Sequence, residues 1–243
     1  MTTTLERIAP FKNEAIKNFT DPADAAAMQA ALARVKARFG ESYPLVIGGK
    51  KIETEKKIRS INPANPDEVV GVISSASKAQ ALEAIEAATA AFESWKRVPM
   101  PERAQYLFKA AELLRQRRFD YDALLTLEVG KSWPEADGDT AEAIDFLEFY
   151  AREAVRYAEP HPIVPMEGER NEMVYIPLGV GAVIPPWNFA GAIMIGMTAA
   201  SIASSACAFD AEEITPTTSS GLAGLIERIF FSVSILLPPM TSG

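Results

Sequence analysis

Apolar residues recur at intervals of three and four along much of the first 160 residues, which is the spacing of amphipathic helices. One such helix is expected from the capping position Ser77 to Trp95. Its inner face is expected to consist of Leu82, Ile85, Ala88 and Phe92. A second helix is expected to begin at Pro101. Its inner face is expected to consist of Tyr106, Leu107, Ala110, Leu113 and Leu114.

Polar and small residues mark the ends of further helices. Asp21 and Pro22 precede an alanine-rich run to Gly40, which predicts a helix that forms a surface arm. The basic residues at 115–118 complement the end of the helix that begins at Pro101, and we interpret them as solvated rather than as a binding site. Another helix is expected over 134–158.

Strand patterns lie before and after these helices. Residues 45–61 carry β-type residues around Gly48-Gly49, which predicts a hairpin or meander. Residues 160–176 are expected to be extended chain and a strand. The apolar run 178–184 contains Gly179 and Gly181, which predicts a strand covered on both faces that ends at Pro185.

The twenty residues 190–209 carry no formal charge and are long enough to cross a bilayer. They are only weakly apolar, because serine, alanine and glycine are frequent, and no Lys/Arg bias flanks them. A buried helix packed under a sheet is therefore predicted instead of a membrane span.

Composition narrows the class of protein. With 243 residues, 48% of them hydrophobic, the chain can form a globular core. A net charge of −8 argues against nucleic acid or an anionic membrane as partner, since those require clustered basic residues. The single cysteine, Cys207, excludes an intrachain disulfide framework, and the first residues lack the pattern of a signal peptide. We therefore expect a cytoplasmic protein.

The helix expected over 134–158 carries carboxylates on neighbouring turns of one flank, at Glu135, Asp139 and Glu142. Such a cluster has two interpretations, a metal site or a solvated acidic face. The chain contains one histidine, His161, so no softer ligand is present to complete a transition-metal site. The solvated face is the prediction, and no metal is expected.

Asn188 follows the strand expected at 178–184, after Pro185, Pro186 and Trp187. Ligands of open α/β sheets bind outside the carboxyl ends of the strands. An uncharged amide there offers two N–H donors that can stabilise a developing oxyanion. The competing interpretation is an ordinary turn punctuated by asparagine and proline.

Two segments together resemble the aldehyde dehydrogenase family. Residues 128–136 match its Glu-x-Gly-Lys-x-x-x-Glu-Ala stretch, and Ile-Pro-Pro-Trp-Asn-Phe follows at 184–189. The Glu-Ala-Ile-Asp-Phe run that begins at Glu142 and the Tyr-Pro-Leu-Val-Ile-Gly-Gly-Lys segment at 43–50 look most like the glutamate γ-semialdehyde (1-pyrroline-5-carboxylate) dehydrogenase branch. The resemblance covers about residues 10–200, and it implies the N-terminal part of a Rossmann-like cofactor domain with a helical N-terminal region.

The resemblance implies a role for each matching residue. Asn188 corresponds to the oxyanion-hole asparagine, and Glu142 and Phe189 are candidates to line the aldehyde pocket. The wall beside the nicotinamide ribose of NAD corresponds to Ile184, Pro185, Pro186 and Trp187. Residues 160–176 correspond to part of a hairpin used for oligomerisation, so a homo-oligomer, or association with a full-length relative, is expected.

The family's pattern is incomplete in this chain. Its nucleophile lies in a Gly-Gln-x-Cys motif and its general base in a Glu-Leu-Gly-Gly motif, and neither occurs here. Only the first strand of the cofactor domain and its helix are expected, so weak or no NAD binding follows. Residues 201–243 contain one basic residue, Arg228, and we interpret them as a divergent or frameshifted tail that follows a truncated domain of residues 1–200.

Three functions are weighed on this basis. The first is an NAD-dependent oxidoreductase by descent, acting on a small aldehyde in proline catabolism, whose truncated chain is inactive alone. The second is a non-catalytic fragment that associates with itself or with an intact relative. The third, a binding module for a small carboxylate, has no arginine clamp in its favour.

Overall fold

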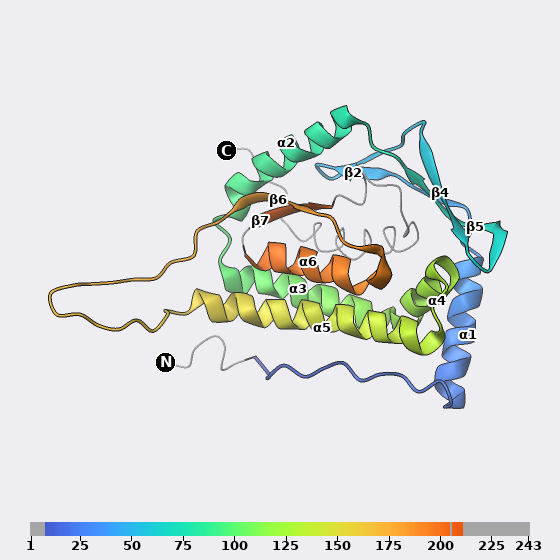
Figure 1. Ribbon diagram of the computed structural model, residues 1–243, viewed down its shortest axis with the longest axis horizontal. Helices are drawn as coiled ribbons and strands as arrows, with labels where there is room; N and C mark the ends of the chain where they lie inside the picture. The colour runs from blue at the N-terminus through green and yellow to red at the C-terminus, as the bar shows by residue number, and fades with distance from the viewer. Residues whose placement is uncertain (1–7, 205, 211–243) are drawn as a thin grey trace.

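A computed structural model describes residues 8–204 and 206–210 of the chain, and these form a mixed α/β fold (Figure 1). The helices are α1 (Pro22–Lys36), α2 (Lys78–Trp95), α3 (Met100–Gln116), α4 (Arg118–Val129), α5 (Trp133–Ala158) and α6 (Ala192–Ala203), with a 3-10 turn η2 (Trp187–Phe189). The strands are β1 (Glu41–Tyr43), β2 (Leu45–Ile47), β3 (Lys50–Ile52), β4 (Lys57–Asn62), β5 (Asn65–Ser74), β6 (Gly179–Val183) and β7 (Ala206–Asp210). The predicted α/β class is confirmed.

The described strands form three small sheets. In the first, of order β1-β5-β4, β1 runs parallel to β5 and β4 runs antiparallel to it. Strands β2 and β3 form a hairpin whose turn residues, Gly48 and Gly49, have φ angles of 56° and 77°. Glycine adopts that left-handed conformation without a steric penalty, so the hairpin predicted there is confirmed.

The third sheet changes the expected organisation of the cofactor domain. Strand β6 pairs in parallel with β7, from Gly179 opposite Ala206 to Val183 opposite Asp210, and α6 connects them. The expectation that only one strand and its helix are present is therefore wrong. The predicted domain boundary at residue 200 falls inside α6, and residues 211–243 of the predicted tail lie outside the described residues.

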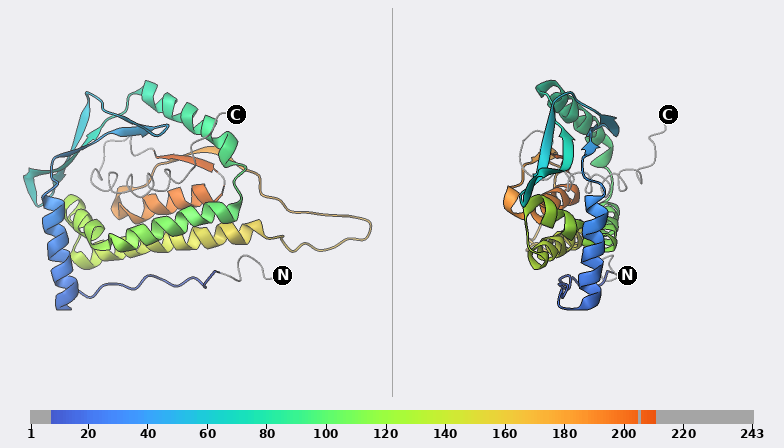
Figure 2. Two further views of the ribbon diagram at one scale, coloured as in Figure 1. Left: turned by 180° about the vertical axis from the view of Figure 1, so that it is seen from behind. Right: turned by 90° about the vertical axis from the view of Figure 1, so that its right-hand side faces the viewer.

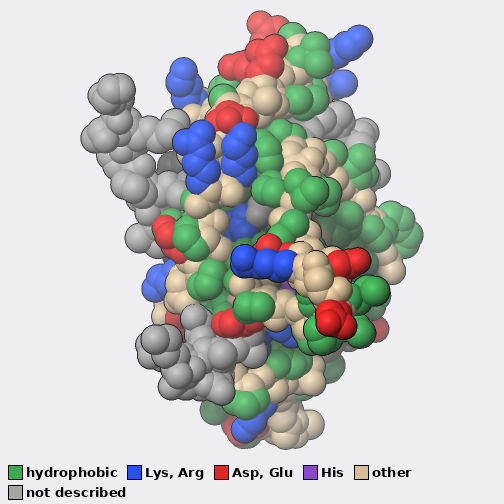
Figure 3. Space-filling model, turned by 90° about the vertical axis from the view of Figure 1, so that its left-hand side faces the viewer, with side chains coloured by type: hydrophobic (Ala, Val, Ile, Leu, Met, Phe, Trp, Pro, Cys, Tyr) green, Lys and Arg blue, Asp and Glu red, His purple; other side chains and the backbone are tan. Residues whose placement is uncertain are grey.

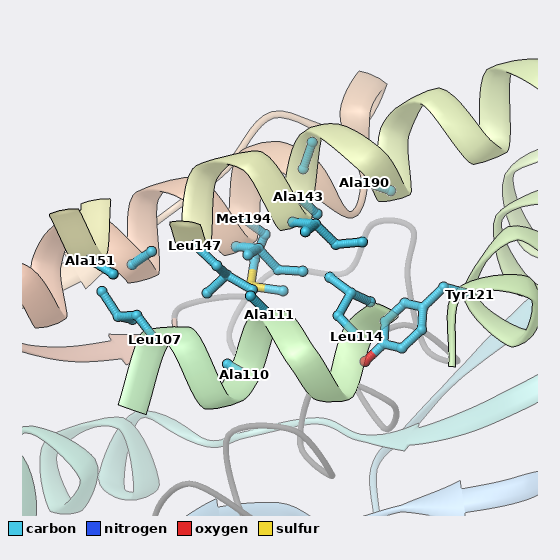
Figure 4. Close-up of a cluster of buried hydrophobic side chains, with 14 of the residues drawn as sticks. Leu107, Ala110, Ala111, Leu114, Tyr121, Ala143, Leu147, Ala151, Ala190 and Met194 are labelled. Carbon is cyan, nitrogen blue, oxygen red and sulfur yellow. The ribbon is translucent and has the colours of Figure 1, made fainter. Parts of the chain in front are cut away.

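The main core lies where α3, α5 and α6 pack together, as the views in Figures 1 and 2 agree. Figure 4 shows its small and branched side chains pointing toward one another between these helices. The fully buried ones from α3 and α5 include Leu107, Ala110, Leu114, Ala143, Leu147 and Ala151. The inner face predicted for the helix that begins near Pro101 is confirmed, with Tyr106 and Leu113 partly buried against the core.

Helix α6 packs closely on α5. A Cβ added at Gly196 would lie 2.8 Å from Cδ2 of Phe146, so a larger residue would force the Phe146 ring or the helix to shift. The buried helix predicted within 190–209 is present over Ala192–Ala203. Within the described residues, no helix combines the length and the hydropathy that a membrane span requires.

Helices α1 and α2 differ from the expectations. Met28 and Ala31 of α1 are fully buried against Ala123 of α4, so α1 is a packed helix and not a free surface arm. Helix α2 begins with the predicted capping box, but it has no buried residue. Leu82 and Ile85 of its predicted inner face are 52% and 41% exposed, because the helix lies at the edge of the fold beside β2, β6 and β7.

The segment before α1 runs along the outside of α5 (Figure 1). The side chain of Asn13 and the backbone N–H of Glu14 both donate to the Asp145 carboxylate at 2.7 Å. The Glu14 carboxylate accepts hydrogen bonds from Arg115 at 2.9 Å and from Arg118 at 3.4 Å. Acidic side chains of α5 and basic side chains near the end of α3 thus hold this segment in place.

Residues 159–178 leave α5 as an extended loop that projects from the body and returns to β6 (Figure 1). Figure 3 views the molecule from the side on which this loop projects. No strand occurs in it, so the strand predicted within 160–176 is wrong. The single turn is closed by a 3.2 Å bond from Glu169 N–H to the Met166 carbonyl, and no cross-strand ladder forms. At the base of the loop, the Tyr175 ring lies 4.8 Å from that of Tyr157 and 5.0 Å from that of His161.

Candidate functional site

The Ile-Pro-Pro-Trp-Asn-Phe segment forms the turn between β6 and α6. Strand β6 ends at Val183, before the prolines, as predicted, because Pro185 and Pro186 have no N–H for a sheet ladder. The predicted burial of β6 on both faces is wrong. Only Val183 is buried, and the residues before it are half-buried or exposed. The turn therefore emerges at the carboxyl end of a strand near the surface.

The side chains of this turn face outward. Ile184 is 63% exposed, Trp187 is 68% exposed and Phe189 is 42% exposed. Asn188 is also exposed, and its amide makes no hydrogen bond to the described part of the chain. Its two N–H donors are therefore available to a ligand, as an oxyanion-binding amide requires. Ala190, directly after the turn, is buried.

Asp139 of α5 joins this turn to the rest of the site. Its Oδ1 accepts a 2.6 Å hydrogen bond from the backbone N–H of Ala192, the first residue of α6. Its Oδ2 accepts a 2.6 Å bond from Lys131 Nζ. The same ammonium lies 4.5 Å from the centre of the Phe189 ring. One buried carboxylate thus connects α5, Lys131 and the start of α6.

Glu142 lies one turn further along α5 and is exposed. Partial burial and the neighbouring Asp139 carboxylate raise the pKa of Glu142, while Lys131 lowers it. Glu142 and Phe189, the two residues predicted to line an aldehyde pocket, therefore both interact with Lys131. No described contact connects Glu142 with Asn188.

The Glu-x-Gly-Lys-x-x-x-Glu stretch has a structural explanation in this fold. Glu128 accepts a 2.7 Å hydrogen bond from Ser60 of β4. Gly130 ends α4 in the left-handed conformation, with φ of 75°. Lys131 then reaches Asp139, and Glu135 caps the start of α5 by accepting a 3.1 Å bond from the Ser132 backbone N–H. The stretch fixes the α4–α5 connection under the candidate site.

The predicted solvated acidic face of α5 is confirmed for Glu135 and Glu142, which are exposed, and is wrong for Asp139, which is buried. Asp137 and Asp139 are fully buried, because each has a basic partner from elsewhere in the chain. Asp139 pairs with Lys131, and Asp137 pairs with Arg118. The prediction of a solvated basic end at 115–118 is wrong for Arg118, which is 4% exposed, whereas Arg115 is 35% exposed.

A metal centre is the other interpretation of the carboxylates on α5. Among residues 8–204 and 206–210, no three His, Cys, Asp or Glu side chains gather in a way that could hold a metal ion. The buried carboxylates are already neutralised by arginine and lysine. Ion pairing therefore accounts for their spacing.

The sequence model of the aldehyde dehydrogenase family matches residues 51–236, a range that includes the Glu-x-Gly-Lys stretch and the turn at the end of β6. The chain belongs to this family. The match continues past residue 200, where the predicted resemblance ended.

Several of the similar curated proteins are named 1-pyrroline-5-carboxylate dehydrogenase. The chain is 47% identical over 193 residues to 1-pyrroline-5-carboxylate dehydrogenase 2 of Bacillus subtilis (strain 168), which covers 79% of this chain and 38% of that protein. It is 44% identical over 222 residues to the 1-pyrroline-5-carboxylate dehydrogenase of Oceanobacillus iheyensis, which covers 91% of this chain and 43% of that one. Among solved structures, 1-pyrroline-5-carboxylate dehydrogenase from Thermus with bound NAD has a TM-score of 0.85 and 42% identity, over 96% of this chain and 44% of that one.

The chain thus spans less than half the length of these relatives. The fold prediction of an N-terminal part of an aldehyde dehydrogenase is confirmed. The roles assigned to Asn188, to residues 184–187, and to Glu142 and Phe189 stay predictions. So do the boundary at 200 and the divergent character of 201–243.

Sequence reasoning missed the two residues that organise the site. In the sequence, Lys131 is one position of the family motif and Asp139 is one of the carboxylates of an acidic flank. A lysine and an aspartate eight residues apart across a helix start carry no local signal of pairing. Their contact, and the contact of Asp139 with Ala192, depend on how α4, α5 and α6 pack.

Proposed function

We propose that this chain is the N-terminal part of an NAD-dependent dehydrogenase that oxidises glutamate γ-semialdehyde, the open form of 1-pyrroline-5-carboxylate, to glutamate. In that reaction the aldehyde, water and NAD⁺ give the carboxylate, NADH and protons. The observation that carries the proposal is the exposed amide of Asn188 at the carboxyl end of β6, which has no hydrogen-bond partner among the described residues. The names of the most similar proteins supply the substrate.

Each residue of the turn has a task in this proposal. The Asn188 amide donates hydrogen bonds to the oxygen that becomes negative when the aldehyde carbon is attacked. Ile184 and Trp187 offer exposed apolar surface against which the ribose and nicotinamide of NAD can lie. NAD, when bound, accepts the hydride. The parallel pair β6–β7 fits such a ligand, since dinucleotides bind at the carboxyl ends of parallel strands.

We propose further that the chain alone does not turn over the aldehyde. The Gly-Gln-x-Cys and Glu-Leu-Gly-Gly motifs of the family are absent from the sequence. A nucleophile and base that act as a unit are not replaced by the remaining groups. Incubation with glutamate semialdehyde and NAD should therefore yield no NADH. Turnover of about 1 per second or more, abolished by Cys207→Ala, would contradict this expectation.

The substrate is tested by supplying the missing part. The chain is co-expressed with the remaining C-terminal portion of the Bacillus subtilis relative, and the assembled complex is purified and assayed for NADH formation. Glutamate semialdehyde should be oxidised, and Asn188→Ala should lower kcat about 100-fold to 1000-fold, as expected for loss of an oxyanion donor. A purified complex that oxidises other aldehydes but not this one would refute the substrate assignment.

A second candidate is association of the chain with a copy of itself or with a full-length relative. The extended loop exposes several large apolar side chains, which soluble monomers seldom gather in one segment. The most exposed are Val164 at 84%, Leu178 at 83%, Ile176 at 77% and Val174 at 65%. Association should bury this loop.

Light scattering over a range of concentrations tests this candidate. The chain is expected to be larger than a monomer, and Val164→Asp with Ile176→Asp should shift it toward the monomer. The matched control is Leu82→Asp, an equally apolar exposed residue on α2, outside the loop. A monodisperse monomer at every concentration would speak against association.

A further inference from the structure

We propose that Asp139 is the positioning residue of the candidate active site: its carboxylate fixes the turn that carries Asn188 against α5. This inference rests on the proposed function, because it assigns the residue that holds the predicted oxyanion donor in place. Asp139 is buried and its carboxylate contacts Ala192 and Lys131, so it acts through the turn.

The turn has few other attachments. Pro185 and Pro186 lack N–H groups, and η2 has no side-chain cap at its start. Helix α6 likewise has no side-chain cap from its own N-cap residue, Gly191. The first N–H groups of a helix need external acceptors, and the carboxylate of Asp139 supplies one at 2.6 Å to Ala192. Its negative charge also suits the positive end of the α6 dipole.

The position of this bond explains why it governs Asn188. Ala192 is four residues after Asn188, and the intervening Ala190 and Gly191 are buried. On the other side, the nearest regular backbone pairing is that of Val183 in β6. Residues 184–189 are therefore held at two ends, by β6–β7 and by the start of α6, where the buried Ala190 and Ala192 pack and Asp139 supplies the polar contact.

The second carboxylate oxygen adds a constraint on the other side of the turn. Lys131 Nζ donates to Oδ2 of Asp139, and its side chain is 14% exposed while that of Asp139 is 0% exposed. The ammonium then lies 4.5 Å from the centre of the Phe189 ring, within the range of a cation–π attraction. Asp139 thus fixes the position of Phe189 through Lys131, and it fixes the start of α6 directly through Ala192.

Amide hydrogen exchange of the whole chain tests the positioning without requiring activity. Asp139→Ala should raise exchange over residues 187–195 at least about tenfold, because the Ala192 amide loses its acceptor. Asp139→Asn keeps one acceptor oxygen for the Ala192 N–H, so Ala192 should stay protected. The uncharged amide no longer forms an ion pair with Lys131. Asp145→Ala is the matched control on the same helix, since Asp145 binds only the segment before α1. It should alter exchange near residues 13–14 and leave 187–195 unchanged.

Unchanged exchange over 187–195 in a folded Asp139→Ala variant would overturn the proposal. If that variant does not fold, Asp139→Asn and Lys131→Met carry the test. Both should leave Ala192 protected and raise the access of acrylamide to Trp187, measured with Trp95 and Trp133 replaced by phenylalanine. Unaltered quenching in both variants would equally refute it.

A double-mutant cycle separates positioning from general stability in the assembled dehydrogenase. Asp139→Asn should lower kcat about tenfold with little change in KM, because the oxyanion contact is made in the transition state. In an Asn188→Ala background the same substitution should have no further effect on kcat. Additive losses would mean that Asp139 does not act through Asn188. Altered exchange together with an inactive wild-type complex would refute the proposed substrate and leave the positioning intact.

Discussion

Arg118 of α4 donates two hydrogen bonds to the Asp137 carboxylate of α5, at 2.6 Å and 2.8 Å, and both side chains are buried. The backbone N–H of Lys17 donates to the same carboxylate at 2.7 Å. The pair therefore joins three parts of the chain, the N-terminal segment, α4 and α5. A bidentate arginine is well suited to this task because its donors match the geometry of a carboxylate.

Arg118→Leu should destabilise the protein by about 3–5 kcal/mol, because it leaves Asp137 charged and buried without its main partner. The free energy of unfolding is measured by urea denaturation. Lys96→Ala is the control, since Lys96 and Glu93 form a pair with side chains 33% and 63% exposed. Loss of an exposed pair should cost less than about 1 kcal/mol. Equal losses in the two variants would contradict this account of Arg118.

Asp122, one turn after Arg118 on α4, makes stability depend on pH. It is fully buried. Burial raises the pKa of Asp122 to about 7, with a further increase from Asp137, although Thr140 and Arg118 act in the opposite direction. Glu14 also lies in this cluster through its bond to Arg118. The folded state thus binds a proton that the unfolded state releases near pH 4.

The sign follows from this difference in pKa. The stabilising contribution of protonated Asp122 is fully present below about pH 4 and is lost as the pH rises toward 7. Asp122→Asn mimics the neutral carboxyl, so it should flatten the curve between pH 4 and 7 and stabilise the protein at pH 8 by about 1–4 kcal/mol. Chemical denaturation at pH 5, 6, 7 and 8 measures how the free energy of unfolding depends on pH in the wild type and in Asp122→Asn. Parallel curves for the variant and the wild type would show that Asp122 does not titrate in this range.

Gly196→Ala should destabilise the protein by about 1–3 kcal/mol, although alanine favours helices, because the new methyl group overpacks against Phe146. Gly138 is the matched control, a glycine within α5 with open space around an added Cβ. Gly138→Ala should stabilise by about 0.5–1 kcal/mol. Thermal unfolding of both variants tests the contrast. Phe146→Leu should offset part of the Gly196→Ala loss, and a cost unaffected by Phe146→Leu would locate the strain elsewhere.

The sequence by itself determined the local elements. The Ser77 capping box, the Gly48-Gly49 turn and the end of β6 before Pro185 all follow from residues within a few positions of one another. The inner face of α3 followed from the helical spacing of its apolar residues, because such spacing places them on one side of the helix. The same local information placed Asn188 after a strand, at a position where ligands commonly bind.

Only the tertiary structure decided which side chains are buried and paired. Helical spacing placed Glu135, Asp139 and Glu142 on one flank but did not reveal Lys131, the partner with which Asp139 is buried. It also did not reveal that Arg118 pairs with the buried Asp137. Conversely, the apolar stripe of α2 predicted a buried face, yet Leu82 and Ile85 of that face are exposed because α2 lies at the edge of the fold. Charge pairing and burial act between residues far apart in the chain, whereas propensity and capping act within one or two turns. For this reason the turn that carries Asn188 was visible in the sequence, and Asp139, which holds it, was not.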